Sequence, residues 1–186
     1  ISSASIAAAR ERVRTAGVTN VTFQQADLYA LPFAPRSFDH VFVCFLLEHL
    51  PRPVEALSIL EGLLRPGGTL TVIEGDHGSA YFHPRSAAAE AAIRCLVELQ
   101  HARGGNALIG RQLYPMMVEA GFASVRVSPR MVYVDSSRPA LVDGFTRKTF
   151  TAMIEGIRAP AIAAGLIEPE SFDAGVRDLR RTAAVD

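Results

Sequence analysis

The chain has 186 residues, of which 49% are hydrophobic and 20% are charged, a composition typical of one globular domain. Nineteen Lys and Arg residues balance nineteen Asp and Glu residues, and no long run carries one sign of charge. This balance argues against the basic surface with which proteins bind nucleic acid or anionic lipid.

The N-terminal segment predicts a helix followed by a short strand. Ser2 or Ser3 can cap a helix at 4–16, and Gly17 supplies its terminator. The β-branched residues that follow predict a strand at 21–25. The chain starts within this predicted helix and without a methionine, so we expect it to be truncated.

The next segment predicts the centre of a sheet. After Asp39 and His40, the run 39–45 continues with five apolar residues, which is too continuous for a strand with one solvated face and predicts a central parallel strand. A helix at 53–64 follows, with leucines at three- and four-residue spacing, and Pro66-Gly67-Gly68 is expected to end it. Residues 69–74 predict another buried strand. Strands that alternate with helices through short connections predict an α/β fold with a parallel, doubly wound sheet.

The second half of the chain predicts mostly helices. Helices are expected at 86–103 and 110–120, and a strand at about 124–134 follows them. Pro129 lies inside that strand and has no backbone N–H, which places the strand at a bulge or at a sheet edge. The remaining residues, 138–183, predict further helices with prolines in their first turns.

The cysteines and the hydropathy pattern indicate in which cellular compartment the protein resides. Cys44 and Cys95 lie in apolar stretches and lack the spacing of a metal or redox site. No apolar run approaches the length that crosses a bilayer, and no signal-peptide pattern opens the chain. These features predict a cytoplasmic protein that binds no membrane.

Three segments of the first half carry the most specific pattern, and they are Gln25–Phe33, Ser37–Leu50 and Leu64–Leu70. In this order and at these intervals they resemble the acidic loop, fourth strand and following turn, and helix-to-fifth-strand turn of class I S-adenosylmethionine-dependent methyltransferases. The resemblance is to the group that modifies small molecules such as quinones. A weaker likeness continues over Ile109–Phe122.

The resemblance implies one domain with a Rossmann-like, doubly wound and mostly parallel sheet. Residues 1–78 would form part of the cofactor-binding core, and residues 79–186 would supply substrate-side helices and an edge strand. The family's glycine-rich turn, its ribose-binding acid and its last strand have no counterpart in this sequence, so we expect truncation at both ends.

The family's strand order, 3-2-1-4-5-7-6, yields a specific expectation. The strands at 39–45 and 69–74 should pair in parallel, whereas the strand at 21–25 should have no neighbour and the strand at 124–134 should stand apart from 69–74. Unpaired backbone groups that are normally buried cost on the order of 1–3 kcal/mol each. The chain alone is therefore expected to be poorly stable and to bind the cofactor weakly.

The implied cofactor is S-adenosylmethionine, and its site would include Ala26, Asp27 and Leu28. The Asp27 carboxylate can accept from the adenine amine, and the Leu28 backbone N–H can meet the adjacent ring nitrogen. The backbone of Cys44 and Phe45 would contact the methionine end of the cofactor. From spacing alone, Asp27 can equally be a loop cap, and the side chains of Cys44 and Phe45 can be core.

His49 follows the strand at 39–45, where a histidine can act as a general base or can order the loop. Glu48 is expected to be solvated or structural. His77, Tyr81 and His83 follow the strand at 69–74 and are the substrate-side candidates. A metal site formed by the polar residues of that stretch is disfavoured, since no rigid element fixes three ligands.

The sequence thus predicts methyl transfer from S-adenosylmethionine to a small-molecule acceptor. Methyl transfer needs mainly alignment, which contributes roughly 7–11 kcal/mol, and aromatic faces such as Phe45 or Tyr81 can favour the sulfonium cation. One alternative is a catalytically silent methyltransferase-like module that binds a partner. Another is a nucleotide-sugar or nicotinamide enzyme of similar fold. The acceptor and the oligomeric state are not predicted.

Overall fold

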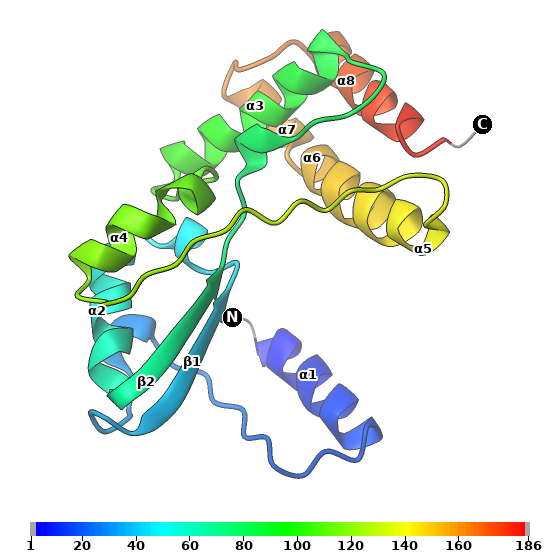
Figure 1. Ribbon diagram of the computed structural model, residues 1–186. Helices are drawn as coiled ribbons and strands as arrows, with labels where there is room; N and C mark the ends of the chain where they lie inside the picture. Colours follow the sequence, from blue (N-terminus) through cyan, green and yellow to red (C-terminus); the bar gives the residue numbers. More distant parts are fainter. Residues whose placement is uncertain (1–2, 185–186) are drawn as a thin grey trace.

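The computed structural model describes residues 3–184, which form a two-stranded sheet and a set of helices (Figure 1). The strands are β1 (Phe38–Cys44) and β2 (Leu64–Ile73). The helices are α1 (Ser3–Thr15), α2 (Pro53–Leu63), α3 (Ala87–Ala102), α4 (Leu113–Glu119), α5 (Pro139–Leu141), α6 (Ala152–Gly156), α7 (Arg158–Ala163) and α8 (Pro169–Arg181), with a π-helix, η5 (Val142–Thr151), between α5 and α6. Short 3-10 turns are η1 (Leu28–Ala30), η2 (Leu47–His49), η3 (His77–Ser79) and η4 (Ile109–Gln112).

The sheet consists of β1 and β2 in parallel, which confirms the predicted pairing of 39–45 with 69–74. The predicted burial of these strands is wrong, because Val43 is the one buried residue of the two strands and no further described strand or helix covers their other face. The register aligns Val43 with Val72 and Cys44 with Ile73. The connecting helix, α2, ends at Leu63. The short β–α–β connection brings the carboxyl ends of both strands to one edge, where open α/β sheets place their ligands.

The Pro-Gly-Gly turn was expected to end the helix, and the structure places it inside β2 instead. The register jumps there, since Phe38 pairs with Leu64 but His40 pairs with Thr69. Gly67 has φ of 80°, a conformation that glycine adopts without steric cost. A Cβ on Gly68 would lie 3.1 Å from the Asp39 backbone oxygen. The glycines therefore form a bulge that lets β2 begin directly after α2.

The predictions of strands at 21–25 and 124–134 are wrong. Both segments lie within the described residues, and neither forms a strand. Both are extended and rich in β-branched residues, and Val21 and Met131 are 44% and 77% exposed. Residues of this kind form strands only where a neighbour pairs with their backbone. Of the predicted order, 3-2-1-4-5-7-6, the structure contains the one adjacent pair β1–β2.

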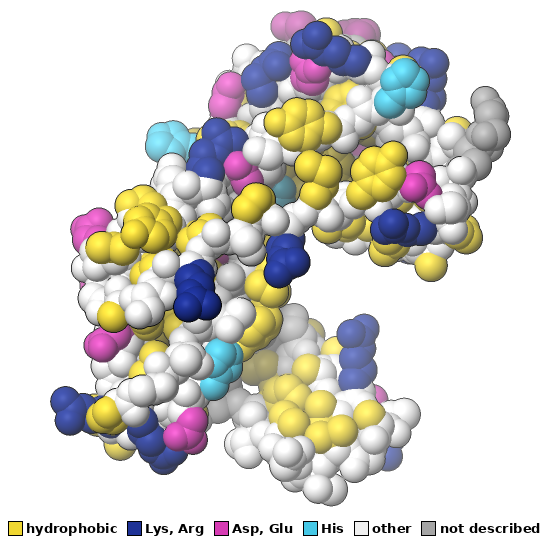
Figure 2. All heavy atoms as spheres, in the orientation of Figure 1, with side chains coloured by type: hydrophobic (Ala, Val, Ile, Leu, Met, Phe, Trp, Pro, Cys, Tyr) yellow, Lys and Arg dark blue, Asp and Glu magenta, His cyan; other side chains and the backbone are white. Residues whose placement is uncertain are grey.

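The first helix, α1, confirms the helix predicted at 4–16 but buries none of its residues. It stands away from the sheet in Figure 1, and Figure 2 shows its hydrophobic side chains on the surface. The Arg10 guanidinium donates to the Phe23 backbone oxygen at 3.2 Å. This contact ties α1 to the extended segment that follows it.

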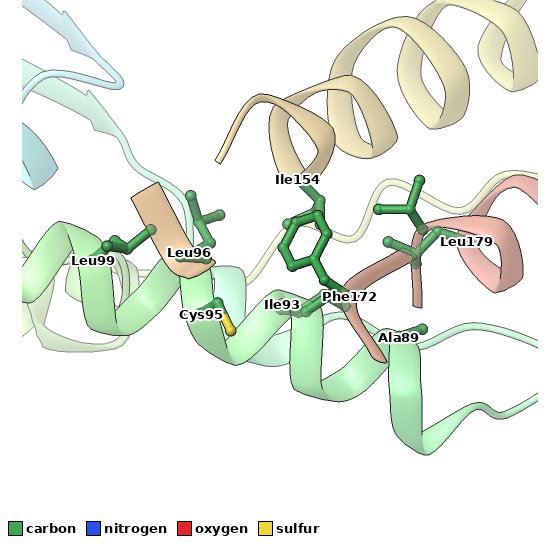
Figure 3. Close-up of a cluster of buried hydrophobic side chains, with 11 residues drawn as sticks. Ala89, Ile93, Cys95, Leu96, Leu99, Ile154, Phe172 and Leu179 are labelled. Carbon is green, nitrogen blue, oxygen red and sulfur yellow. The ribbon is translucent and has the colours of Figure 1, made fainter. Parts of the chain in front are cut away.

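The predicted helices at 86–103 and 138–183 are confirmed, and they share a hydrophobic core (Figure 3). The Ser86 side chain caps α3 by accepting from the Ala89 N–H at 3.1 Å. Phe172 on α8 is fully buried against α3 and α6. A Cβ on Gly175 would collide with the Ala88 carbonyl oxygen, so α8 approaches α3 as closely as two backbones allow.

A second hydrophobic cluster packs α2, η2, η4 and α4 against one face of the sheet. The helix predicted at 110–120 divides here into η4 and α4. The fully buried residues of this cluster include Leu47, Leu57 and Ile109. Since Leu47 lies in η2 and Ile109 in η4, this core also fixes the loops around the carboxyl edge of the sheet.

Candidate functional site

The carboxyl ends of β1 and β2 form the floor of the candidate site. The Phe45 backbone N–H donates to the Ile73 carbonyl oxygen at 2.9 Å, which extends the ladder by one residue. The next step leaves the strand direction, because Phe45 has φ of 49°. Its ring is consequently 53% exposed at the edge of the sheet.

Glu74 fixes the turn after β1. One carboxylate oxygen, Oε1, accepts from the backbone N–H of Leu46 at 2.9 Å and of Leu47 at 2.8 Å. The other oxygen lies 3.4 Å from the Glu48 N–H. These donors open the short helix η2 and have no partner within it, so a carboxylate satisfies them well. Glu74 thereby joins the end of β2 to the turn that follows β1.

Glu48 is buried beside this turn, with 4% of its surface exposed. Its Oε2 atom lies 3.1 Å from His77 Nε2 and accepts from Gln100 Nε2 at 3.2 Å. The hydrogen bond to His77 lowers the pKa of Glu48, against an opposing effect of burial. The carboxylate is therefore ionised at neutral pH, and the expectation of a solvated side chain was wrong, whereas a structural role fits.

The segment around residues 105–110 encloses this network. The Glu48 backbone oxygen accepts from the Asn106 N–H at 2.7 Å and from Gln100 Nε2 at 3.0 Å, and the His77 N–H donates to Ala107 at 2.9 Å. The Gly110 N–H donates to the Gly75 carbonyl oxygen at 3.0 Å. These backbone bonds hold the loops after both strands in one rigid unit.

Asp76 and Arg111 form a bidentate ion pair next to it. The two guanidinium nitrogens lie 2.8 and 2.7 Å from the two carboxylate oxygens, and Ser79 Oγ donates to Asp76 at 2.9 Å. Burial raises the pKa of Asp76, but the bonds from Arg111 and Ser79 outweigh it, and the net shift is downward. Asp76 is thus committed to η4 and is not a free base.

The loop at 26–30 is anchored near the start of α2. Asp27 caps η1 by accepting from the Tyr29 N–H at 3.0 Å. The Tyr29 hydroxyl donates to the Arg52 carbonyl oxygen at 3.3 Å, and the Arg52 guanidinium lies 4.5 Å from the Tyr29 ring centroid. Ala26 and Asp27 are exposed, whereas Leu28 is half-buried. Asp27 therefore does cap the loop, which is one of the two roles that the sequence left open, and its residue remains exposed to solvent.

The predicted polar residues divide into two groups. His77 and Tyr81 line one groove of about 580 Å³ beside α3. His49 lies outside it with 62% of its side chain exposed and its Nε2 atom 3.7 Å from Glu48. His83 is exposed and does not line the groove. Over residues 3–184, no three His, Cys, Asp or Glu side chains are placed to hold a metal ion.

Gln100 and Arg111 were not predicted as parts of this site. A signal for Gln100 exists, because it occupies the position of the apolar stripe of α3 that continues from Ala89, Ile93 and Leu96. A polar residue on such a stripe indicates a buried hydrogen-bond partner. Arg111 carried no comparable signal, since its ion pair depends on a loop 35 residues away.

Comparisons with known proteins point in one direction. Residues 1–72 match the family model of a methyltransferase domain. The chain is 32% identical over 154 residues to an uncharacterized 37.1 kDa protein in transposon TN4556 of Streptomyces fradiae, covering 82% of this chain and 44% of that protein. It is 39% identical over 66 residues to the ubiquinone/menaquinone biosynthesis C-methyltransferase UbiE of Klebsiella pneumoniae, covering 35% and 26%.

Among solved structures, the [4+2]-cyclase SpnF superimposes with a TM-score of 0.54 at 22% identity, over 98% of this chain and 60% of that one. At this identity the likeness shows the fold. The chain spans less than half the length of the curated relatives it matches. None of the helices described over residues 3–184 is long and apolar enough to cross a membrane.

Proposed function

Because this chain belongs to the class I S-adenosylmethionine-dependent methyltransferases, we propose that it transfers a methyl group to a small-molecule acceptor. The observation that supports the proposal is that the Phe45 turn and the His77 loop follow the carboxyl ends of the paired strands β1 and β2, while the Asp27 loop is bonded to Arg52 just before α2. Open α/β sheets bind their ligands at this edge.

The residues present fit the cofactor in their chemistry. Asp27 is exposed, and its carboxylate can accept from the adenine amine while the Leu28 N–H meets the neighbouring ring nitrogen. The ring of Phe45 is 53% exposed at the strand end, where an aromatic face favours a cation. The backbone of Cys44 and Phe45 would then bind the methionine part. Bound here, S-adenosylmethionine supplies an already activated methyl group.

The protein's own task is to orient the acceptor and to exclude water, since alignment can contribute roughly 7–11 kcal/mol. A base is needed only where the acceptor must lose a proton. His49 and His77 are the histidines adjacent to this edge, and His49 is exposed enough to exchange protons with water. Tyr81 lines the groove and His83 lies nearby in sequence; both are proposed on the acceptor side.

The class of acceptor rests on the relatives and on the groove. The UbiE proteins are named for quinone biosynthesis, and a groove of about 580 Å³ falls in the range of small-molecule sites. SpnF is named as a cyclase, and one fold supports several chemistries. The second candidate is a catalytically silent module that binds a partner. A cytoplasmic location stays a prediction.

Calorimetric titration with S-adenosylmethionine tests the proposal, using the protein expressed from its whole natural gene. We expect Asp27→Ala to weaken binding by about 1–3 kcal/mol, because one hydrogen bond to adenine is lost. Asp27→Asn is the matched variant, since its side-chain oxygen can still accept from the adenine amine. Equal affinities for the Asp27→Ala variant and the wild type would remove Asp27 from the site, and no binding at all would favour the silent module.

A further inference from the structure

We propose that η5 is a two-register helix, which converts between the π register of the structure and an α register. The conversion would shift the hydrophobic core behind the groove beside α3, so η5 would act as a conformational device for that part of the fold. The proposal goes beyond methyl transfer and does not depend on it. It rests on the side-chain pairs of η5, on its buried residues and on one unsatisfied hydroxyl group.

A π-helix of ten residues is unusual, because π-turns mostly occur singly inside α-helices, often at functional sites. The backbone bonds of a π-helix join residues five apart, and side chains of η5 interact at the same spacing. Asp143 Oδ2 lies 2.6 Å from Lys148 Nζ, and Thr149 Oγ1 donates to the Gly144 carbonyl oxygen at 2.7 Å. Both pairs therefore match the π register.

An aromatic pair has the same spacing. The rings of Phe145 and Phe150 are stacked with their centroids 6.5 Å apart, a distance at which aromatic rings attract each other. In an α-helix, residues three and four apart are neighbours, whereas residues five apart point to different sides. These contacts would be lost in an α register, so the ion pair and the ring stack favour the π register.

The sequence of η5 also fits an α register. Asp143 and Arg147 are four residues apart, and their opposite charges would be neighbours in an α-helix. In the π register Arg147 instead donates to the Ala183 carbonyl oxygen at 2.8 Å, which ties η5 to the residues after α8. Asp143 thus has an oppositely charged partner in either register, Lys148 in one and Arg147 in the other.

The hydroxyl group of Thr151 favours the α register. Thr151 is 2% exposed, and within the described part of the chain its Oγ1 is the one buried side-chain nitrogen or oxygen that has no hydrogen-bond partner. A buried polar atom without a partner is costly. In an α-helix a threonine hydroxyl can donate to the carbonyl oxygen four residues back, which here belongs to Arg147. The α register would therefore satisfy this atom.

Burial opposes that gain. Val142 and Thr151 are the buried residues of η5, and they are nine positions apart. Nine residues make about two and a half turns of an α-helix, so an α register would turn the two side chains to opposite sides. Val142 would leave its buried position while Thr151 gained its hydrogen bond. Neither register satisfies both residues, and such a conflict makes a helix bistable.

The chain around η5 allows one of its ends to move. Residues 124–137, which precede α5, form no helix or strand and are mostly exposed (Figure 1). The other end is fixed, because Ile154 on α6 is fully buried in the core that α6 shares with α3 and α8. A change of register would therefore rotate the α5 end of η5, and Phe150 would lose Phe145 as its stacking partner.

The core behind η5 links it to the groove beside α3. Phe150 packs against the cluster formed by α3, α6, α7 and α8, and so do Ala80 and Phe82, which line the groove. Because close-packed cores transmit strain, a shift of Phe150 would reach the wall of the groove. The device would thus alter the groove from behind.

Methyl NMR relaxation dispersion on the protein from its whole natural gene tests the proposal, since it detects exchange on the microsecond to millisecond timescale. We expect a minor state populated at about 1–10%, which exchanges at the Thr151 and Ala80 methyl groups with one common rate. Ala56, fully buried in the second cluster, is the matched control and should show no exchange. A flat profile at Thr151, or exchange there that Ala80 does not share, would overturn the proposal.

Two substitutions should move the minor population, measured at the Ala80 methyl group, in opposite directions. Thr151→Val keeps the branched shape and removes the unsatisfied hydroxyl group, so it should lower the α population about two- to tenfold. Phe145→Leu removes the ring stack and should raise it by about the same factor. Changes of the same sign in the two variants would contradict the two registers.

A surface variant covers the case in which a buried substitution disturbs folding. Lys148 has a 72% exposed side chain, so Lys148→Gln removes its ion pair without altering the core. It should raise the α population about twofold or more. Arg14→Gln, which removes an exposed ion pair on α1, is the matched control and should leave the population unchanged. Equal effects of Lys148→Gln and Arg14→Gln would show that the spacing of the pair does not matter and would refute the proposal.

Discussion

Replacing Glu74 by alanine tests whether this carboxylate holds the site together. Its Oε1 atom accepts from the N–H groups of Leu46 and Leu47 at 2.9 and 2.8 Å. Each hydrogen bond to a charged group contributes about 1.5–3 kcal/mol. Glu74 is only half-buried, so water can replace part of what is lost. We therefore expect Glu74→Ala to lower the free energy of unfolding by about 2–4 kcal/mol.

Urea unfolding followed by circular dichroism measures this change. The matched variant is Glu74→Gln, whose side-chain oxygen can still accept from both N–H groups, and we expect a loss of about 1 kcal/mol for it. The urea midpoint should fall with an unchanged slope, since neither variant alters the surface exposed on unfolding. If Glu74→Ala lies within about 0.5 kcal/mol of the wild type, as substitutions of unimportant surface residues do, the turn does not depend on Glu74.

Two further predictions concern packing and pH. Gly175→Ala should destabilise the protein by about 1–3 kcal/mol in a urea melt, because the new Cβ would collide with the Ala88 carbonyl oxygen. Gly62→Ala on α2, where a Cβ meets nothing within 4 Å, should instead stabilise the protein by up to about 1 kcal/mol. Equal changes in stability for Gly175→Ala and Gly62→Ala would contradict the close contact between α8 and α3. The lowered pKa of Glu48 means that its stabilisation is present above the unfolded value of about 4.3 and is lost as the pH falls through the lower folded value. The titratable groups that face Glu48 are His77 and His49. The difference in free energy of unfolding between the wild type and Glu48→Gln should therefore shrink as the pH falls from 6 to about 3. A constant difference would show that the charge of Glu48 does not contribute to stability.

The sequence predicted the elements whose partners lie close in the chain. The parallel pairing of 39–45 with 69–74 followed from two apolar runs joined by one helix, and the Ser86 cap marked the start of α3. The strands at 21–25 and 124–134 failed because a strand depends on a distant backbone that composition does not specify.

The site divides in the same way. A histidine after a strand could be found from the sequence, but the partners of His77 could not. Glu48 and Gln100 lie 29 and 52 residues from their contacts in this network, and only the fold brings them together. The hypothesis that His49 is either a base or a loop-ordering residue used its position after β1, and its 62% side-chain exposure depends on how η2 turns.

The central claim is tested most directly by a crystal structure of the protein from its whole natural gene with S-adenosylhomocysteine. The account predicts adenine against Asp27 and Leu28, the amino-acid part against Cys44 and Phe45, and the sulfur atom directed towards the groove that His77 and Tyr81 line. Electron density for the nucleoside at any other place on the chain would contradict the proposed function, as would a crystal soaked at saturating concentration with no density at this edge of the sheet.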